Sequence, residues 1–300
     1  GRRFAIGLFH AVFNHDLGFY PLNGSMIDTP ALPLQQHKYF ADALRRLGQP
    51  AALQKIPGAA PLVTLKRFGL RFASRGPVWS NATDPAARID TLRNSPLRLI
   101  NANVAAPDIY RAAGFRMMMT PASVAELDLS STSEQRIAHA KPKWRNAWRR
   151  AEEAAFTVKT QTFDPGQHQW LLNADEAQQK AKGYRALPHA ILVAYAQGNP
   201  NNAVVFLARQ NRECIAAMLL LLHRPVATYH LGWSGPLGRQ LNAHHRLVFA
   251  AADWLQNKRY RRFDLGVVDT DNAPGLARFK IGTGADVRSL GGTWLRLPGL

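Results

Sequence analysis

The sequence is poor in cysteine, in long apolar runs and in acidic residues. Its single cysteine, Cys214, excludes an internal disulfide. Cys214 adjoins an apolar stretch, which favours a small buried hydrophobic residue over a nucleophile. The longest apolar run, residues 215–222, is far shorter than the roughly 20 residues that cross a bilayer. We therefore expect neither a disulfide framework nor a transmembrane segment.

Metal-binding patterns are also missing. No set of Cys and His residues has the spacing of a zinc site. His244 and His245 are adjacent, and adjacent residues of a helix point in different directions. We therefore expect no metal ion.

A large positive charge is present instead. The chain carries 38 Lys and Arg against 20 Asp and Glu, a net charge of +18. Such a charge predicts a partner with phosphates: nucleic acid, a nucleotide-linked substrate, coenzyme A or an anionic membrane surface. A solvated basic surface with no specific role is the alternative. Basic residues form two clusters, Lys143, Arg145, Arg149 and Arg150 on a predicted helix, and Lys258, Arg259, Arg261 and Arg262 before a predicted strand.

The length of 300 residues and a hydrophobic content of 46% fit two folded domains. Apolar spacing predicts helices at residues 34–47, 133–155 and 244–256, and Pro142 should kink or split the second of them. Continuous apolar runs predict strands at residues 203–209, 214–223 and 226–233, buried on both faces. We place the domain boundary after the basic helix, giving domains of residues 1–156 and 157–300.

Both halves share an order of elements. A turn at residues 75–79, a short helix and a strand in the first half correspond to a loop at 234–239, a helix and the strand 263–268 in the second. This order indicates two copies of one α/β fold in tandem. The second copy ends in a strand that delivers Asp264 to a polar loop, followed by the basic element Arg278-Phe279-Lys280 and several glycines. Many α/β sites are assembled in this way.

These residues resemble a known family. Asp264-Leu265-Gly266, the stretch 272–280 (NAPGLARFK), Gly282, Gly284 and Gly291-Gly292 are similar to the C-terminal signature of the Fem family. Residues 127–130 and 143–152 resemble the end of that family's first domain, Arg75-Gly76-Pro77 matches its RGP turn, and residues 36–48 resemble its early helix. The resemblance covers residues 34–296. It implies two tandem GNAT-like (acyl-CoA N-acyltransferase-like) domains of mixed α/β class, in a short form without the family's helical arm.

The resemblance also implies a function. Fem proteins transfer an aminoacyl group from aminoacyl-tRNA to an amine of a peptidoglycan precursor, and related proteins use small molecules or lipids. We therefore expect a cytoplasmic acyltransferase that needs no cofactor, with a phosphate-bearing or small amine acceptor and a peripheral contact with an anionic membrane among its partners. Ala277, Thr283 and Ala181 depart from the family pattern, which leaves the acceptor open.

Two alternatives remain. The segment Lys143-Trp144-Arg145-Asn146 also resembles GNAT-like proteins that use acyl-CoA, so an acyl-CoA-dependent N-acyltransferase is one. The loop 235–239 lies where GNAT folds hold the pyrophosphate of coenzyme A, but Pro236 lacks a backbone donor, which favours tRNA. The other alternative is a catalytically silent protein that binds tRNA or nucleotides.

Candidate site residues follow from the same resemblance. Lys280 would lie near the transferred group and stabilise the oxyanion or bind a phosphate. Asp264 would take or orient the amine proton; a helix cap or a structural partner for Arg278 is its alternative role. Tyr229 and His230 would line the cleft. Substrate phosphates would be held by Arg278, Lys182, Tyr184, Arg185 and Arg239, and the two basic clusters would contact the tRNA. Trp144 and Trp148, four residues apart, are predicted to face the core rather than stack on nucleotides.

Overall fold

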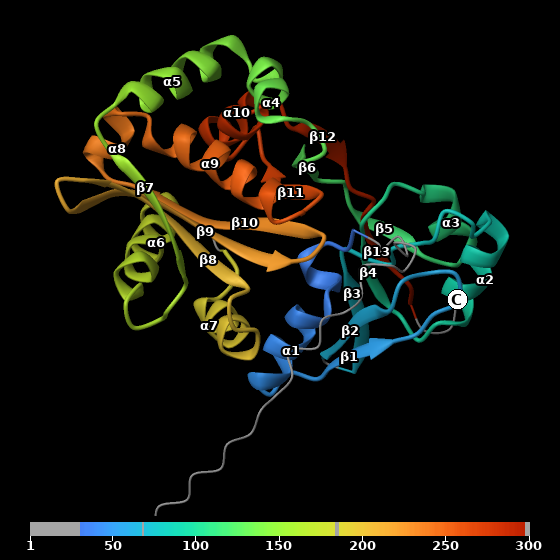
Figure 1. The fold of residues 1–300 in the computed structure, drawn as a ribbon. Coiled ribbons are helices and arrows are strands. Elements are labelled where there is room, and N and C mark those ends of the chain that lie inside the picture. Colours follow the sequence, from blue (N-terminus) through green and yellow to red (C-terminus); the bar gives the residue numbers. More distant parts are fainter. Residues whose placement is uncertain (1–30, 68, 184–185, 298–300) are drawn as a thin grey trace, which may run out of the picture.

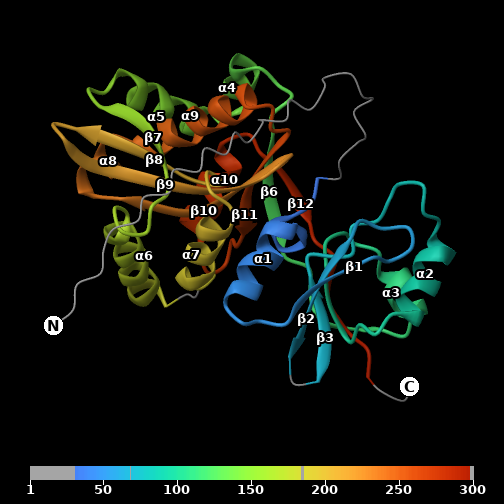
Figure 2. The same ribbon diagram turned by 60° about the horizontal axis from the view of Figure 1, so that its bottom comes forward.

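The computed structural model describes residues 31–67, 69–183 and 186–297. Its strands form two sheets that lie side by side, each covered by helices (Figures 1 and 2). Tyr184 and Arg185, two of the predicted phosphate-binding residues, lie outside the described residues.

The first sheet has six strands. Their order is β1 (Ala51–Gln54), β2 (Leu62–Arg67), β3 (Leu70–Ser74), β4 (Leu99–Ala102), β13 (Gly292–Leu295) and β5 (Arg116–Met119). Helices α2 (Pro85–Asn94) and α3 (Pro107–Ala112) cover one face. Its core is centred on Trp294, which is fully buried and stacks on Tyr110 with ring centroids 5.1 Å apart.

The second sheet has seven strands. Their order is β12 (Asp286–Ser289), β6 (Ser123–Asp128), β11 (Arg262–Val268), β10 (Val226–Ser234), β9 (Glu213–His223), β8 (Ala203–Gln210) and β7 (Thr157–Thr162). On one face lie α4 (Ser133–His139), α5 (Pro142–Glu153), α9 (Ala243–Asn257) and α10 (Pro274–Gly282), and on the other α6 (Gln169–Lys182) and α7 (His189–Gly198). Residues 215–223 of β9 are all buried, which confirms the predicted burial on both faces for this strand, whereas β10 is half-buried over much of its length.

Helix α1 (Lys38–Arg46), preceded by the short 3-10 helix η1 (Leu34–Gln36), lies between the two sheets. Phe40 and Leu44 of α1 share a core with Val63 of the first sheet and with Leu192 and Tyr195 of α7. This shared core fixes the two sheets against each other, because the same apolar face of α1 is removed from water by both.

The sheets exchange strands across the expected boundary near residue 156. β6, which precedes that boundary, pairs with β11 and β12 in the second sheet, and β13, which follows it, pairs with β4 and β5 in the first. The seven-stranded sheet is therefore built from residues 123–289, and the chain returns to the six-stranded sheet for its last strand.

Two local predictions had opposite outcomes. The helix predicted over residues 133–155 is split into α4 and α5, and Pro142 is the first residue of α5, where its missing N–H costs no hydrogen bond. The loop predicted at residues 234–239 is wrong, because the structure has a short helix there, α8 (Pro236–Gln240). Pro236 begins it for the same reason that Pro142 begins α5.

Replacing Trp294 by Ala should lower the free energy of unfolding by about 3–5 kcal/mol, because it removes a fully buried indole and leaves a cavity. Urea unfolding followed by circular dichroism measures this, and Thr293→Ala, on the same strand and half-buried, is the matched control. Equal stability of the two variants would contradict the central place of Trp294.

Candidate active site

The candidate site lies where β10 and β11 separate. These parallel strands pair only from Val226 with Arg262 to Thr228 with Asp264. Beyond that point each strand has an irregularity against its other neighbour, between Tyr229 and Leu231 in β10 and between Asp264 and Gly266 in β11. Bulges bend a strand and redirect its side chains. The two strands therefore diverge beyond Thr228 and Asp264.

Lys280 lies at this divergence. It is on α10, which follows β11, and its side chain is 6% exposed. Its Nζ donates a hydrogen bond to the carbonyl oxygen of Val267 at 2.8 Å. Burial lowers the pKa of Lys280 to about 8, and the carboxylate of Asp264 opposes this change. Lys280 is thus a buried cation that loses its charge much more readily than a surface lysine.

Asp264 is fixed by groups on both sides of the junction between the sheets. Its Oδ1 accepts a hydrogen bond from the backbone N–H of Gly266 at 2.7 Å, and its Oδ2 lies 3.8 Å from Nη2 of Arg75. Burial raises the pKa of Asp264, and the Arg75 guanidinium opposes that rise. The alternative role of Asp264 as a partner for Arg278 is wrong, because the partner is Arg75 and Arg278 is exposed.

A buried ion network surrounds this pair. Glu126 on β6 accepts two hydrogen bonds from Arg288 on β12, at 2.9 and 3.1 Å, and lies 3.9 Å from Arg75 and 3.8 Å from Arg262. Burial alone would raise the pKa of Glu126, but the hydrogen bond from Arg288 and the three arginine charges bring it below the ordinary value. Glu126 is therefore ionised at neutral pH.

The network also ties the two sheets together. Asn103, just after β4 of the first sheet, accepts hydrogen bonds from Arg75 at 3.1 Å and from Arg288 through its backbone carbonyl at 2.8 Å. Arg75 follows β3 and has a left-handed backbone, with φ of 57°. Its Nη2 is buried without a hydrogen-bond partner among the described residues. A left-handed arginine with an unsatisfied nitrogen indicates that the position is held for its charge.

Aromatic side chains from β10, α9 and α10 lie next to this region. The hydroxyl of Tyr229 lies 3.0 Å from Nε2 of His244, and the His244 ring packs edge-on against Phe279, next to Lys280, at 5.6 Å. Burial lowers the pKa of His244 to about 4, so its ring is neutral at pH 7. A Cβ at Gly232 would lie 1.9 Å from the Tyr229 hydroxyl, so that position requires glycine.

The other predicted residues are dispersed. His230 faces α6 and α7, next to Asp175 and His189, and burial lowers its pKa to about 4; it lies on the face of the sheet opposite Tyr229. Lys182 is exposed at the end of α6, also on that face. Arg239 is exposed on α8 and donates to the carbonyl of Ser234. The structure thus brings Lys280, Asp264 and Tyr229 to one region and leaves the others outside it.

The predicted RNA-binding residues differ in exposure. Lys143, Arg149 and Arg150 are exposed on α5, whereas Arg145 is half-buried and donates to the carbonyl of Ala138 at 2.9 Å. In the second cluster Lys258, Arg259 and Arg261 are exposed, but Arg262 is turned inward and donates to the carbonyl of Ala31 at 2.7 Å. Trp144 is 5% exposed and packs on Phe249 at 4.7 Å, which confirms that it faces the core.

Sequence reasoning missed Glu126, Asn103, Arg288 and His244 as parts of this region. A glutamate flanked by apolar residues, as Glu126 is by Ala125 and Leu127, is a usable signal, because a buried carboxylate needs a cation or a donor. Nothing in the sequence identifies that cation as Arg288, 162 residues away.

Replacing Asp264 by Asn should lower the pKa of Lys280 below about 8, because the carboxylate charge raises that pKa and the amide oxygen can still accept from Gly266. An NMR titration of isotopically dimethylated lysine in both proteins measures the change. The control is Asp286→Asn, which removes the charge of an exposed residue of β12. An unchanged pKa in Asp264→Asn would show that the two charges do not interact.

Within the described ranges, no helix combines the length and the apolar character needed to span a membrane. The same part of the chain contains no group of three or more His, Cys, Asp or Glu side chains placed to hold a metal ion.

Comparison with known proteins begins with a family model. A model described as an acetyltransferase (GNAT) domain matches residues 138–280, which include β10, α9, β11 and Lys280. No curated protein gives a significant sequence match.

Solved structures extend the likeness to nearly the whole chain. The crystal structure of FemX has a TM-score of 0.69 at 14% identity, covering 87% of this chain and 91% of that one. The C-terminal domain of a putative lysylphosphatidylglycerol synthetase from Agrobacterium fabrum has a TM-score of 0.56 at 14% identity, covering 88% and 89%. L-PGS from Bacillus licheniformis has a TM-score of 0.52 at 13% identity, covering 90% and 94%. The chain therefore has the tandem GNAT-like fold seen in FemX, and its resemblance to the Fem family is confirmed at the level of the fold.

Proposed function

We propose that this protein transfers an aminoacyl group from aminoacyl-tRNA to the amine of an acceptor molecule, in the cytoplasm, where charged tRNA is available. The observation that carries the proposal is the buried Lys280 cation at the divergence of β10 and β11, with Asp264 beside it. A cation held in a site of low polarity stabilises a developing negative charge far better than one in water.

The reaction needs few groups from the protein. The neutral amine nitrogen attacks the ester carbonyl carbon, a C–N bond forms, and the carbonyl oxygen becomes an oxyanion that Lys280 stabilises. The C–O bond to the ribose then breaks, and the ribose oxygen takes up the proton that the amine loses. Asp264 holds Gly266 and raises the pKa of Lys280, so it keeps the lysine charged and in place.

The start of α8 supports tRNA over acyl-CoA as the donor. This is the segment that would hold a pyrophosphate, and two of its backbone positions cannot donate to one: Gly235 N–H already donates to the carbonyl of Ile215 at 2.9 Å, and Pro236 has no N–H. Fewer backbone N–H groups are therefore left to bind a pyrophosphate.

The match of residues 138–280 to a GNAT acetyltransferase model favours acyl-CoA-dependent acyl transfer as the second candidate. The acceptor in either case is a small or phosphate-bearing amine. The fold shared with FemX and with a putative lysylphosphatidylglycerol synthetase domain supports testing peptidoglycan precursors and lipid head groups first as acceptors.

Lys280→Ala should lower kcat for transfer by about 10²–10³-fold, the cost of removing one oxyanion donor. The assay compares a charged tRNA with an acyl-CoA as the labelled donor. Lys55→Ala, an exposed lysine of the first domain, is the control. Full activity of Lys280→Ala would exclude the proposed role of Lys280. Transfer by the wild type from acyl-CoA alone would favour the second candidate. No transfer by the wild type from either donor would favour a binding protein.

The rate should also fall as pH rises through about 8. The pKa of Lys280 is lowered from 10.5 to about 8, so the fraction that carries the required charge decreases above that pH rather than above 10. In Lys280→Arg the descending limb should disappear, because arginine stays protonated. A pH–rate profile of kcat for both proteins measures this, and an unchanged limb in Lys280→Arg would assign it to another group.

A further inference from the structure

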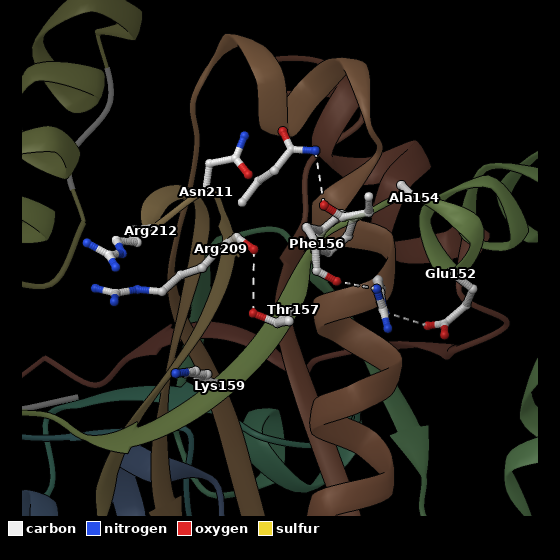
Figure 3. A pocket seen from close by; sticks show the side chains of 11 residues that line it. Glu152, Ala154, Phe156, Thr157, Lys159, Arg209, Asn211 and Arg212 are labelled. Carbon is white, nitrogen blue, oxygen red and sulfur yellow. Dashed lines mark hydrogen bonds and ion pairs between the residues drawn. The ribbon is translucent and has the colours of Figure 1, made fainter.

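A basic hollow lies on the second sheet, next to the first turn of α9 (Figure 3). It has a volume of about 480 Å³ and is formed by the end of α5, the start of β7, the turn between β8 and β9, and α9. Four cations and one acid line it: Lys159, Arg209, Arg212, Arg246 and Glu152. We call it the β8–β9 pocket.

The single acid is already neutralised. Arg246 pairs with Glu152 at 3.1 Å, donates to the carbonyl of Phe156 at 2.9 Å and lies over the Phe156 ring at 4.9 Å (Figure 3). Lys159, Arg209 and Arg212 have no ion pair with any described carboxylate, and Nε of Arg209 is buried without a hydrogen-bond partner there. The pocket thus presents three uncompensated cations, which favours an anionic ligand.

The turn that carries Arg212 is costly for this residue. Asn211 and Arg212 both have positive φ, 48° and 69°, as a two-residue hairpin turn requires. Glycine is the usual second residue of such a turn, and a residue with a Cβ in this conformation costs about 1–2 kcal/mol. The arginine extends from the tip of the hairpin on the same side as Arg209 and Lys159 (Figure 3).

The pocket and the transfer site both involve the first residues of α9. His244 and His245 pack against Phe279, the neighbour of Lys280, at 5.6 and 5.0 Å, and the next residue, Arg246, lines the pocket. The exposed cations of α5 lie on the helix whose end forms the pocket. Helix α5, which carries these exposed cations, therefore ends at the pocket.

The cluster at residues 258–262 lies elsewhere. Arg262 pairs with Val226 at the start of β10, whereas Ser234 at its end pairs with Ala216, near the β8–β9 turn. Eight steps of about 3.3 Å separate the two ends of the strand by roughly 26 Å. The structure thus places the two predicted RNA-binding clusters at opposite ends of the sheet, and only the α5 cluster adjoins the pocket.

We infer that the β8–β9 pocket binds phosphodiester groups near the 3′ end of the donor RNA, guided there by the exposed basic residues of α5. The inference rests on the proposed function, because it names the part of the donor that this site holds. The lining favours RNA over a membrane surface: it is concave, and it adds Gln210, Asn211 and Thr157 as neutral hydrogen-bonding groups beside the cations.

The test measures RNA binding without the reaction. Lys159→Gln/Arg212→Gln removes two exposed charges of the pocket, and the control Lys55→Gln/Lys66→Gln removes two exposed charges from the region of the first sheet. Fluorescence anisotropy with uncharged tRNA and with a short single-stranded RNA ending in CCA gives affinity as a function of salt. The pocket variant should bind both roughly tenfold more weakly, with a salt slope reduced by about 1.4, since each phosphate contact of a single strand contributes about 0.7.

Lys280→Ala should bind RNA as the wild type does, which separates the two proposals. Weaker RNA binding in the pocket variant together with no transfer from charged tRNA would retain the pocket as an RNA site and reject the proposed function. Wild-type affinity of the pocket variant, or an equal loss in the control variant, would overturn the inference. Binding of coenzyme A and of phosphatidylglycerol vesicles is measured in parallel. A pocket variant that loses affinity only for one of these two ligands, and not for RNA, would also overturn the inference.

Discussion

The pairing of Arg75 with Asp264 inside the junction of the two sheets is the contact on which the site depends. Taking two charges out of water costs several kcal/mol for each ion, and their attraction offsets this only where further partners complete the geometry. Here Asp264 also accepts a hydrogen bond from the backbone N–H of Gly266, and Arg75 also donates one to the side-chain oxygen of Asn103. Because these groups come from distant segments, they meet only when both sheets are formed and docked.

Asp264 of this contact also acts on the candidate catalytic lysine. Burial favours neutral Lys280 and the Asp264 charge favours the cation, and the resulting pKa of about 8 lies close to neutral pH. Titratable groups with pKa values shifted toward working pH are typical of catalytic sites. An exposed lysine with an ordinary pKa would also be charged at neutral pH. Its charge would act more weakly on the reacting atoms, because water around it has a much higher dielectric constant than a buried site.

Much of the fold could be predicted from the chain. The strands over residues 203–233 were predicted because their apolar runs are continuous, and the split at Pro142 because proline has no backbone N–H to donate. The short strands β1, β5 and β12 were not predicted: each has four residues, and the three methionines of β5 are exposed and do not alternate with polar residues, so no strand periodicity marks it. The pairing partners of β6 and β13 could not be predicted either, since local sequence does not determine long-range register.

The sequence by itself determined the net charge, the apolar strands and the order of Asp264, the polar loop and Lys280, because composition, periodicity and spacing are local properties. Tertiary structure decided which groups meet. It paired Asp264 with Arg75, turned His230 away from Tyr229 at a bulge, and placed the basic cluster of α5, but not the one at 258–262, beside the β8–β9 pocket. The physical reason is that ion pairs and pockets form between segments far apart in the chain, whose positions depend on strand register, bulges and the packing of α1 between the sheets.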